Sequence, residues 1–225
     1  MNAPVSLSLK LRTATKALHT QAERSGLMGA LLKGRATRPG YAALLVALEA
    51  IYLALEEGLA AQAKDPLLGP LVIPGFARAH ALSADLASLA RHGVSIPGVA
   101  AEARRYAEHL RQLSVSDPTR LLAHAWLRYL GDLNGGQIVG SIVRASLALP
   151  QDATRFYEFP ALADPMAAAG AWRRALDNAP FDATTQADLV EEACDGFRRH
   201  IALFEALALA PSAGTHDAAD SSSTA

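Results

Sequence analysis

Residues 123–140 read AHAWLRYLGDLNGGQIVG, and the interpretation of the whole chain starts from this segment. It belongs to a stretch from Thr119 to about Leu147 that is rich in Leu and Ala and is followed by Pro150. Such a composition predicts one long helix. Each of its four glycines costs the helix about 0.5–1 kcal/mol relative to alanine. A helix that keeps them therefore needs a surface without side chains.

The spacing of these glycines predicts where that surface lies. Gly131 and Gly135 are four residues apart, and so are Gly136 and Gly140. Residues four apart lie on the same side of a helix, so two neighbouring strips lack side chains. A flat ligand can approach such a surface closely. A tight contact between two helices is the alternative explanation, and the glycine spacing alone leaves both open.

The rest of the chain carries the same helical signals. Apolar residues such as Leu7, Leu11, Ala14, Leu18 and Ala22 repeat at helical spacing. We expect further helices over about 6–26, 42–57, 76–91, 98–113, 164–178 and 182–209.

Single residues are expected to mark several helix ends. Gly26 is predicted to end the first helix, Gly58 to interrupt the second, and Asp117 with Pro118 to begin the long one. No strand pattern is visible, so the sequence predicts a single all-α domain over residues 1–210. The Ser-, Ala- and Asp-rich residues 211–225 are predicted to form a disordered tail.

Composition narrows the class of protein. The 225 residues are 51% apolar and carry a net charge of −1. The apolar content is high enough for the chain to fold without metal or disulfide. The net charge near zero argues against a dedicated nucleic-acid-binding protein. The single cysteine, Cys194, excludes a disulfide framework and fits a reducing compartment. With no secretory signal and no run of about 20 apolar residues, we expect a cytoplasmic protein without a membrane anchor.

Charge is distributed unevenly along the chain. Residues 1–40 carry a net charge of +6, and the remainder carries −7. A basic N-terminal region suggests an anionic ligand or an acidic partner. An ordinary solvated charged face is the alternative.

The first predicted helix carries a polar stripe of Arg12, Lys16, His19 and Glu23, with spacings of four, three and four residues. Arg12 and His19 differ by only about 20° around the helix axis and by about 10 Å along it. This layout suits a planar dianionic ligand with a central metal, because cations bind its carboxylates while the imidazole reaches the metal. Glu23 is placed to accept the second N–H of His19, directly or through water. A surface histidine in a solvated stripe is the alternative.

Together, Leu11–Glu23 and Ala123–Gln137 resemble the haem oxygenase family, as do Ile51–Glu57 and parts of residues 191–205. The likeness extends over about residues 8–207. It implies an all-α fold in which haem lies between a proximal helix and a glycine-rich distal helix. It further implies a soluble, bacterial-type enzyme that opens the haem ring with O₂ and electrons, giving biliverdin, CO and ferrous iron.

The resemblance also implies residue roles. It makes His19 the proximal iron ligand, with Glu23 as its partner, and Phe197 a pocket-lining residue. On the distal side, Gly131 and Gly135 would face the haem with Gly136 close by, and Asp132 would organise water with Arg128 and Tyr52. Arg12, Lys16 and Arg173 would bind the haem propionates.

Electrons would come from a ferredoxin, a flavodoxin or an NAD(P)H-dependent reductase. The basic N-terminal region is a candidate docking surface for such an acidic donor.

Two other functions are consistent with parts of the pattern. A haem carrier or storage protein without turnover would share His19 and the glycine surface. A related helical enzyme, such as a thiaminase-like hydrolase, would need Cys194 as its nucleophile, although an inert packing thiol is the simpler interpretation. The histidines outside the stripe show no recognisable metal-ligand spacing, and His124 is interpreted as a packing or surface residue.

Overall fold

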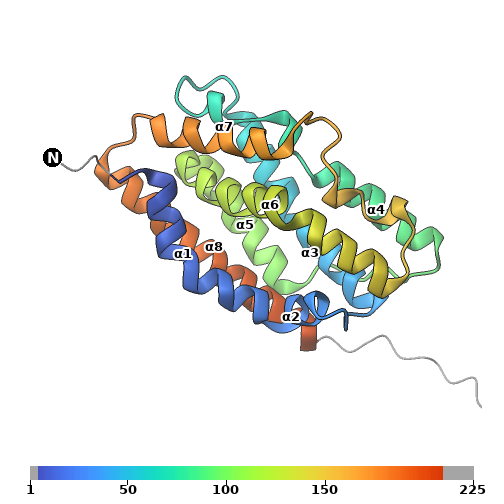
Figure 1. The fold of residues 1–225 in the computed structure, drawn as a ribbon. Coiled ribbons are helices and arrows are strands. Elements are labelled where there is room, and N and C mark those ends of the chain that lie inside the picture. Colours follow the sequence, from blue (N-terminus) through green and yellow to red (C-terminus); the bar gives the residue numbers. More distant parts are fainter. Residues whose placement is uncertain (1–4, 210–225) are drawn as a thin grey trace, which may run out of the picture.

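The structure, a computed structural model, describes residues 5–209. Those residues form eight α-helices joined by loops and short 3₁₀ turns, with no strand among them (Figure 1). The all-α class predicted from the sequence is confirmed. The helices are α1 (Leu7–Arg24), α2 (Gly26–Leu32), α3 (Arg38–Ala61), α4 (Ala79–Arg91), α5 (Ala101–Ser116), α6 (Leu121–Leu147), α7 (Pro165–Asn178) and α8 (Ala183–Leu209). The predicted domain end at residue 210 and the predicted tail lie outside the described residues.

Two helices organise the packing. Helix α3 packs against α4, α5 and α6, whereas α8 packs against α1, α2 and α6 (Figure 1). Helix α7 contacts both α1 and α6. Because α1 and α6 contact each other little, α8 and α7 fix the distance between them.

Side-chain caps explain several helix starts. Ser6, Thr37 and Asp164 each accept a backbone N–H three residues later, at the starts of α1, α3 and α7. Such a cap contributes about 1 kcal/mol. Arg38 also donates to the carbonyls of Leu147 and Ala148, at 2.9 and 3.0 Å. The start of α3 is thereby tied to the end of α6.

Two glycines have structural roles that differ from the sequence prediction. Gly26 does not simply end the first helix: α1 ends at Arg24, and Gly26 starts the separate helix α2 with a φ of +41°. A Cβ at Gly26 would overlap the carbonyl oxygen of Phe204 on α8. Gly58 does not interrupt α3, which continues to Ala61. A Cβ there would lie 2.8 Å from the side chain of Leu121, so close approach of α6 to α3 requires glycine.

Two further local predictions were wrong. Asp117 is followed by a 3₁₀ turn, Pro118–Arg120, and α6 begins only at Leu121. The Asp117 carboxylate accepts from Arg120 Nε at 3.1 Å and makes no N-cap hydrogen bond. On α1, Ala14 is exposed while Thr15 is buried, and the buried Thr15 hydroxyl is satisfied because it donates to the carbonyl of Leu11 at 2.8 Å.

Candidate active site

The glycines of α6 form two strips with different surroundings. A Cβ at Gly131 or Gly135 would meet no atom of residues 5–209 within 4 Å, so this strip is open in the described part of the chain. A Cβ at Gly140 would lie 2.9 Å from the side chain of Tyr157, and one at Gly136 would lie 3.7 Å from it. Both explanations of the glycine spacing therefore apply, one to each strip. Because Gly136 is buried beside Tyr157, packing accounts for its small size, and its part in ligand binding stays a prediction.

Next to the open strip lies a buried polar network formed by Asp132 and Arg128 of α6 and Tyr52 of α3. Asp132 accepts from the Tyr52 hydroxyl and from Arg128 Nη2, the latter at 3.0 Å. Arg128 Nε also donates to the Tyr52 oxygen at 3.1 Å. The structure thus brings together the three residues that the sequence predicts to be catalytic.

This network is closed by His200 of α8. Its Nδ1–H donates to the Gly196 carbonyl at 2.8 Å, which leaves Nε2 to accept from Arg128 Nη1 at 3.4 Å. Burial and the nearby Arg128 charge lower the pKa of His200 well below its usual value, so it is neutral. His200 therefore helps to orient the guanidinium of Arg128.

The ionisation of the network depends on opposing effects. Burial raises the pKa of Asp132, while the Arg128 charge and the Tyr52 hydrogen bond act against that rise. Burial also raises the pKa of Tyr52 well above its usual value, so the phenol keeps its proton. A buried carboxylate with these partners can hold water or exchange a proton beside the open strip.

The polar stripe of α1 lies on its exposed side. Arg12, Lys16, His19 and Glu23 are all exposed. His19 Nδ1 lies 3.6 Å from Glu23 Oε2, which is too long for a direct hydrogen bond. Of the two predicted contacts between His19 and Glu23, direct and through water, only the one through water is consistent with this distance. The His19 ring packs edge-on against Phe197 of α8, with 5.7 Å between the ring centres.

Helix α7 brings one more cation to the glycine helix. Arg173 Nη2 donates to Asn134 Oδ1 at 3.2 Å, and Asn134 is the neighbour of Gly135 in the sequence. Arg173 therefore lies beside the open strip. Asn134 was not predicted as a site residue.

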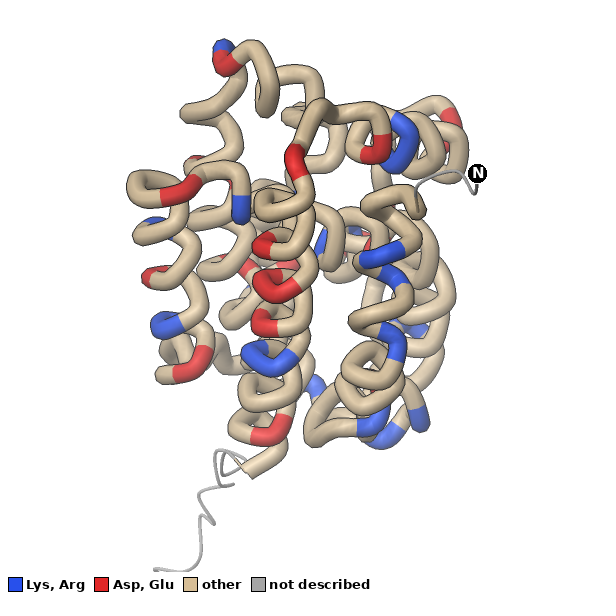
Figure 2. Tube along the Cα trace, turned by 90° about the vertical axis from the view of Figure 1, so that its left-hand side faces the viewer, with Lys and Arg blue, Asp and Glu red and all other residues tan. Residues whose placement is uncertain are grey.

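Basic side chains gather on one side of the molecule. Figure 2 shows Lys and Arg positions mostly on the right-hand side of the view, and Asp and Glu positions mostly elsewhere. This agrees with the +6 charge of residues 1–40. The docking of an electron donor there stays a prediction.

Sequence reasoning missed a second buried polar cluster, and its interpretation of His124 was incomplete. His124 is fully buried. Its Nδ1 forms a hydrogen bond with the Tyr106 hydroxyl at 2.8 Å, and its Nε2 forms one with Glu192 Oε1 at 3.0 Å. Burial works to raise the pKa of Glu192, but His109 and His124 together lower it well below its usual value.

A signal for this cluster is present in the sequence of α8. Glu192, Gly196 and His200 are spaced four residues apart, which places them on one face of the helix. A Cβ at Gly196 would lie 3.1 Å from His124 Nδ1, so the glycine makes room for the imidazole.

Comparison with known proteins identifies the family. The family model described as Heme oxygenase matches residues 5–206. The chain belongs to the heme oxygenase family. The resemblance stated from the sequence and the predicted enzyme class, a haem-degrading oxygenase, are confirmed.

Individual relatives agree with this assignment. Heme oxygenase 1 of Synechocystis sp. is 34% identical over 207 residues, covering 90% of this chain and 85% of the relative. Heme oxygenase 1 of Homo sapiens is 35% identical over 224 residues, covering 97% and 76%.

Solved structures agree as well. A crystal structure of heme oxygenase-1 from Synechocystis sp. in complex with heme matches with a TM-score of 0.83 and 33% identity, covering 89% of this chain and 91% of that one. The structure of heme oxygenase from Leptospira interrogans matches with a TM-score of 0.84 and 30% identity, covering 89% and 99%. Within residues 5–209, no helix has the length and apolar character needed to cross a membrane.

Proposed function

We propose that this chain binds haem between the exposed stripe of α1 and the open strip of α6, and opens the ring with O₂ and electrons. The products are biliverdin, CO and ferrous iron. The observation that carries the proposal is the open strip of Gly131 and Gly135 beside the buried Asp132 carboxylate. Side chains at these two glycines would fill the space that a flat ligand needs.

The donor set fits haem. His19 on α1 supplies an exposed imidazole as the iron ligand, with Phe197 against its ring and Glu23 one helical turn away. Arg12, Lys16 and Arg173 supply cations for the two propionates. Gly136 contributes backbone next to the open strip.

The iron of bound haem supplies the O₂-binding and O₂-activating chemistry. The residues of the chain position the substrate and control protons around it. Glycine at positions 131 and 135 keeps acidic and imidazole side chains away from the distal face. Asp132, fixed by Arg128 and Tyr52, holds water and supplies a proton through it.

A reductase partner supplies electrons, as is general for this family. We propose a ferredoxin, a flavodoxin or an NAD(P)H-dependent reductase as the donor, with the basic N-terminal region as its docking surface. The proposed location is the cytoplasm, where a single thiol fits the reducing conditions.

The two alternative functions are less well supported. A non-catalytic carrier is not favoured, because the family and its named relatives are oxygenases. A hydrolase with Cys194 as nucleophile is not favoured either, because the Cys194 sulfur lies 3.9 Å from the carbonyl of Ala14, in the contact between α8 and α1.

The decisive experiment adds haemin to the purified chain and follows the Soret band. Reductant and O₂ are then supplied, and biliverdin is measured by its absorbance. His19→Ala is expected to lose the histidine-ligand signature of the ferrous spectrum. His80→Ala, which changes an exposed histidine of α4, serves as the matched control. A normal ferrous spectrum from His19→Ala would assign the iron ligand elsewhere, and haem binding without biliverdin would favour the carrier.

A further inference from the structure

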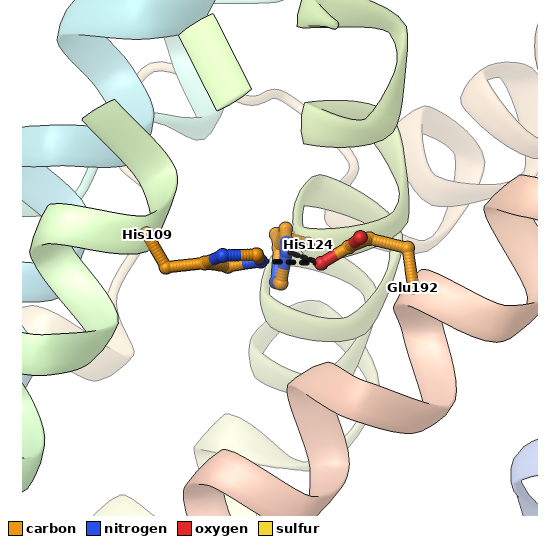
Figure 3. Close-up of side chains that lie close together, drawn as sticks. All are labelled: His109, His124 and Glu192. Carbon is orange, nitrogen blue, oxygen red and sulfur yellow. Dashed lines mark hydrogen bonds and ion pairs between the residues drawn. The ribbon is translucent and has the colours of Figure 1, made fainter. Parts of the chain in front are cut away.

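His109, His124 and Glu192 come from three different helices, α5, α6 and α8, and their side chains point toward one another (Figure 3). Their candidate ligand atoms all lie within 4.8 Å of one another. The Nε2 atoms of His109 and His124 lie 2.6 and 3.0 Å from the same oxygen, Glu192 Oε1. We propose that these three residues form a site for a divalent cation of the zinc type, separate from the haem site.

The donor set is the first argument. Two imidazoles and one carboxylate are a common protein ligand set for Zn²⁺, which binds such atoms at about 2.0–2.2 Å. Ligand atoms around a tetrahedral zinc are then separated by ~3.3 Å. The observed separations from Oε1 are 2.6 and 3.0 Å. To coordinate one cation, these two contacts would lengthen by about 0.3–0.7 Å, and the two imidazole nitrogens would also have to lie about 3.3 Å apart.

The ligands are oriented by outer partners. The Tyr106 hydroxyl contacts His124 Nδ1 at 2.8 Å, and Arg120 Nη1 donates to Glu192 Oε2 at 3.3 Å. These contacts direct His124 Nε2 and Glu192 Oε1 toward His109. A hydroxyl can donate or accept, so Tyr106 suits both the tautomer that donates to Glu192 and the tautomer that binds a metal.

The ion-pair network that contains Glu192 carries a net negative charge, although Arg104 and Arg105 also line the pocket beside His109. Glu192 belongs to a network of contacts that joins four carboxylates, Glu192, Asp117, Asp188 and Asp195, to two arginines, Arg120 and Arg199. With neutral histidines this network has two negative charges in excess. A divalent cation would neutralise that excess.

The cluster is also reachable. The His109 side chain is 21% exposed, whereas His124 is fully buried. His109 lines a surface pocket of about 480 Å³ together with Arg104, Arg105, Glu108, Gln112 and Arg199. A water from this pocket can complete the coordination, and Asp195 Oδ2, 4.0 Å from His109 Nε2, is a second candidate. A bound cation would tie α5, α6 and α8 together.

The test uses the full chain, freed of metal by a chelator and without haem. Co²⁺ is titrated as the probe, because it gives visible absorption bands when bound in place of Zn²⁺, and Zn²⁺ is then added as the competitor. We expect one Co²⁺ per chain, displaced by one Zn²⁺. His109→Gln, at the partly exposed edge of the cluster, is expected to weaken binding by about tenfold or more, since loss of even an outer-shell partner costs 10–100-fold.

Two histidine variants serve as controls. His80→Gln changes an exposed histidine on α4, and His19→Ala removes the proposed iron ligand; both are expected to bind Co²⁺ like the unchanged chain. Circular dichroism verifies that His109→Gln is folded. Absence of 1:1 binding to the unchanged chain would overturn the proposal, as would equal binding by folded His109→Gln. Loss of binding in His19→Ala would assign the cation to α1 and also overturn it.

Discussion

Replacing Asp132 by alanine separates the chemical role of this carboxylate from its structural role. The Asp132 and Arg128 side chains are 10% and 13% exposed, and their ion pair measures 3.0 Å. Among residues 5–209, Asp132→Ala leaves the guanidinium with the Tyr52 hydroxyl and His200 as hydrogen-bond partners. Removing one member of such a buried pair costs about 3–5 kcal/mol. In a chain of this size, that lowers the melting temperature by about 6–20 °C.

A double variant, Asp132→Ala with Arg128→Leu, removes the buried charge as well as its partner. Apolar replacement of a buried ion pair is often neutral in stability. The double variant is therefore expected to regain at least about half of the lost stability. Biliverdin formation is expected to stay lost in both variants, because neither holds water with a carboxylate. Asp132→Asn keeps hydrogen bonding without charge and is expected to give an intermediate yield.

The assays are thermal melting, haemin titration through the Soret band, and biliverdin yield under reductant and O₂. With peroxide, both alanine variants are expected to oxidise a reporter dye like a peroxidase, at the expense of ring opening. If the double variant recovered biliverdin yield along with stability, the carboxylate would be structural only. A normal yield from Asp132→Ala would place the proton supply in other residues.

Four further predictions concern the glycine strips, the propionate site and a buried carboxylate. Gly131→Leu is expected to keep or raise the stability of the haem-free chain by up to about 1 kcal/mol, because the position is open and leucine favours helix, while haem affinity falls. Gly140→Ala forces a close contact with Tyr157 and is expected to lower the free energy of unfolding by about 1–3 kcal/mol. Equal melting temperatures for Gly131→Leu and Gly140→Ala would contradict the description of one open and one packed strip. Arg12→Gln combined with Arg173→Gln is expected to change the ratio of biliverdin isomers without changing the melting temperature, and an unchanged ratio with unchanged haem affinity would remove both residues from the propionate site. Burial raises the pKa of Asp85 to about 6, despite two backbone N–H donors. In the unfolded chain the pKa of an aspartate is about 3.9. The free energy of unfolding of the native protein is therefore expected to fall by about 3 kcal/mol, relative to that of Asp85→Asn, as the pH rises from about 4 to above 6. Parallel curves of stability against pH for the two proteins would contradict this.

The parts of the site that share one helix could be predicted from the sequence. Helical spacing alone identifies the glycine strips of α6 and the Arg12–Glu23 stripe of α1, because 3.6 residues per turn fixes which residues share a face. The pairing of Tyr52 with Asp132 came only from the family resemblance, since 80 residues separate them in the chain. The glycine spacing also could not show which strip is open, because that depends on Tyr157 from a different segment.

Contacts between helices account for what the sequence did not predict. Gly26 and Gly58 resemble helix breakers in isolation, but each admits a neighbouring helix at close range. The spacing of Glu192, Gly196 and His200 on α8 indicates one side of this cluster, but His109 and His124 come from two other helices. Periodicity within one helix therefore shows neither the contacts made at Gly26 and Gly58 nor the complete cluster.

Helix α8 joins the two sides of the proposed haem site. Phe197 on α8 packs against His19 of α1, while His200, three residues later, contacts Arg128 of α6. Since α1 and α6 contact each other little, their separation depends on α8 and on α7. The sequence motifs on α1 and α6 therefore specify the chemistry of each face, but α8 and α7 set the distance between the faces. The close approach of α8 to His124 at Gly196 fixes the position of α8 against α6, so a larger residue there would shift the proposed iron ligand relative to Asp132, Arg128 and Tyr52.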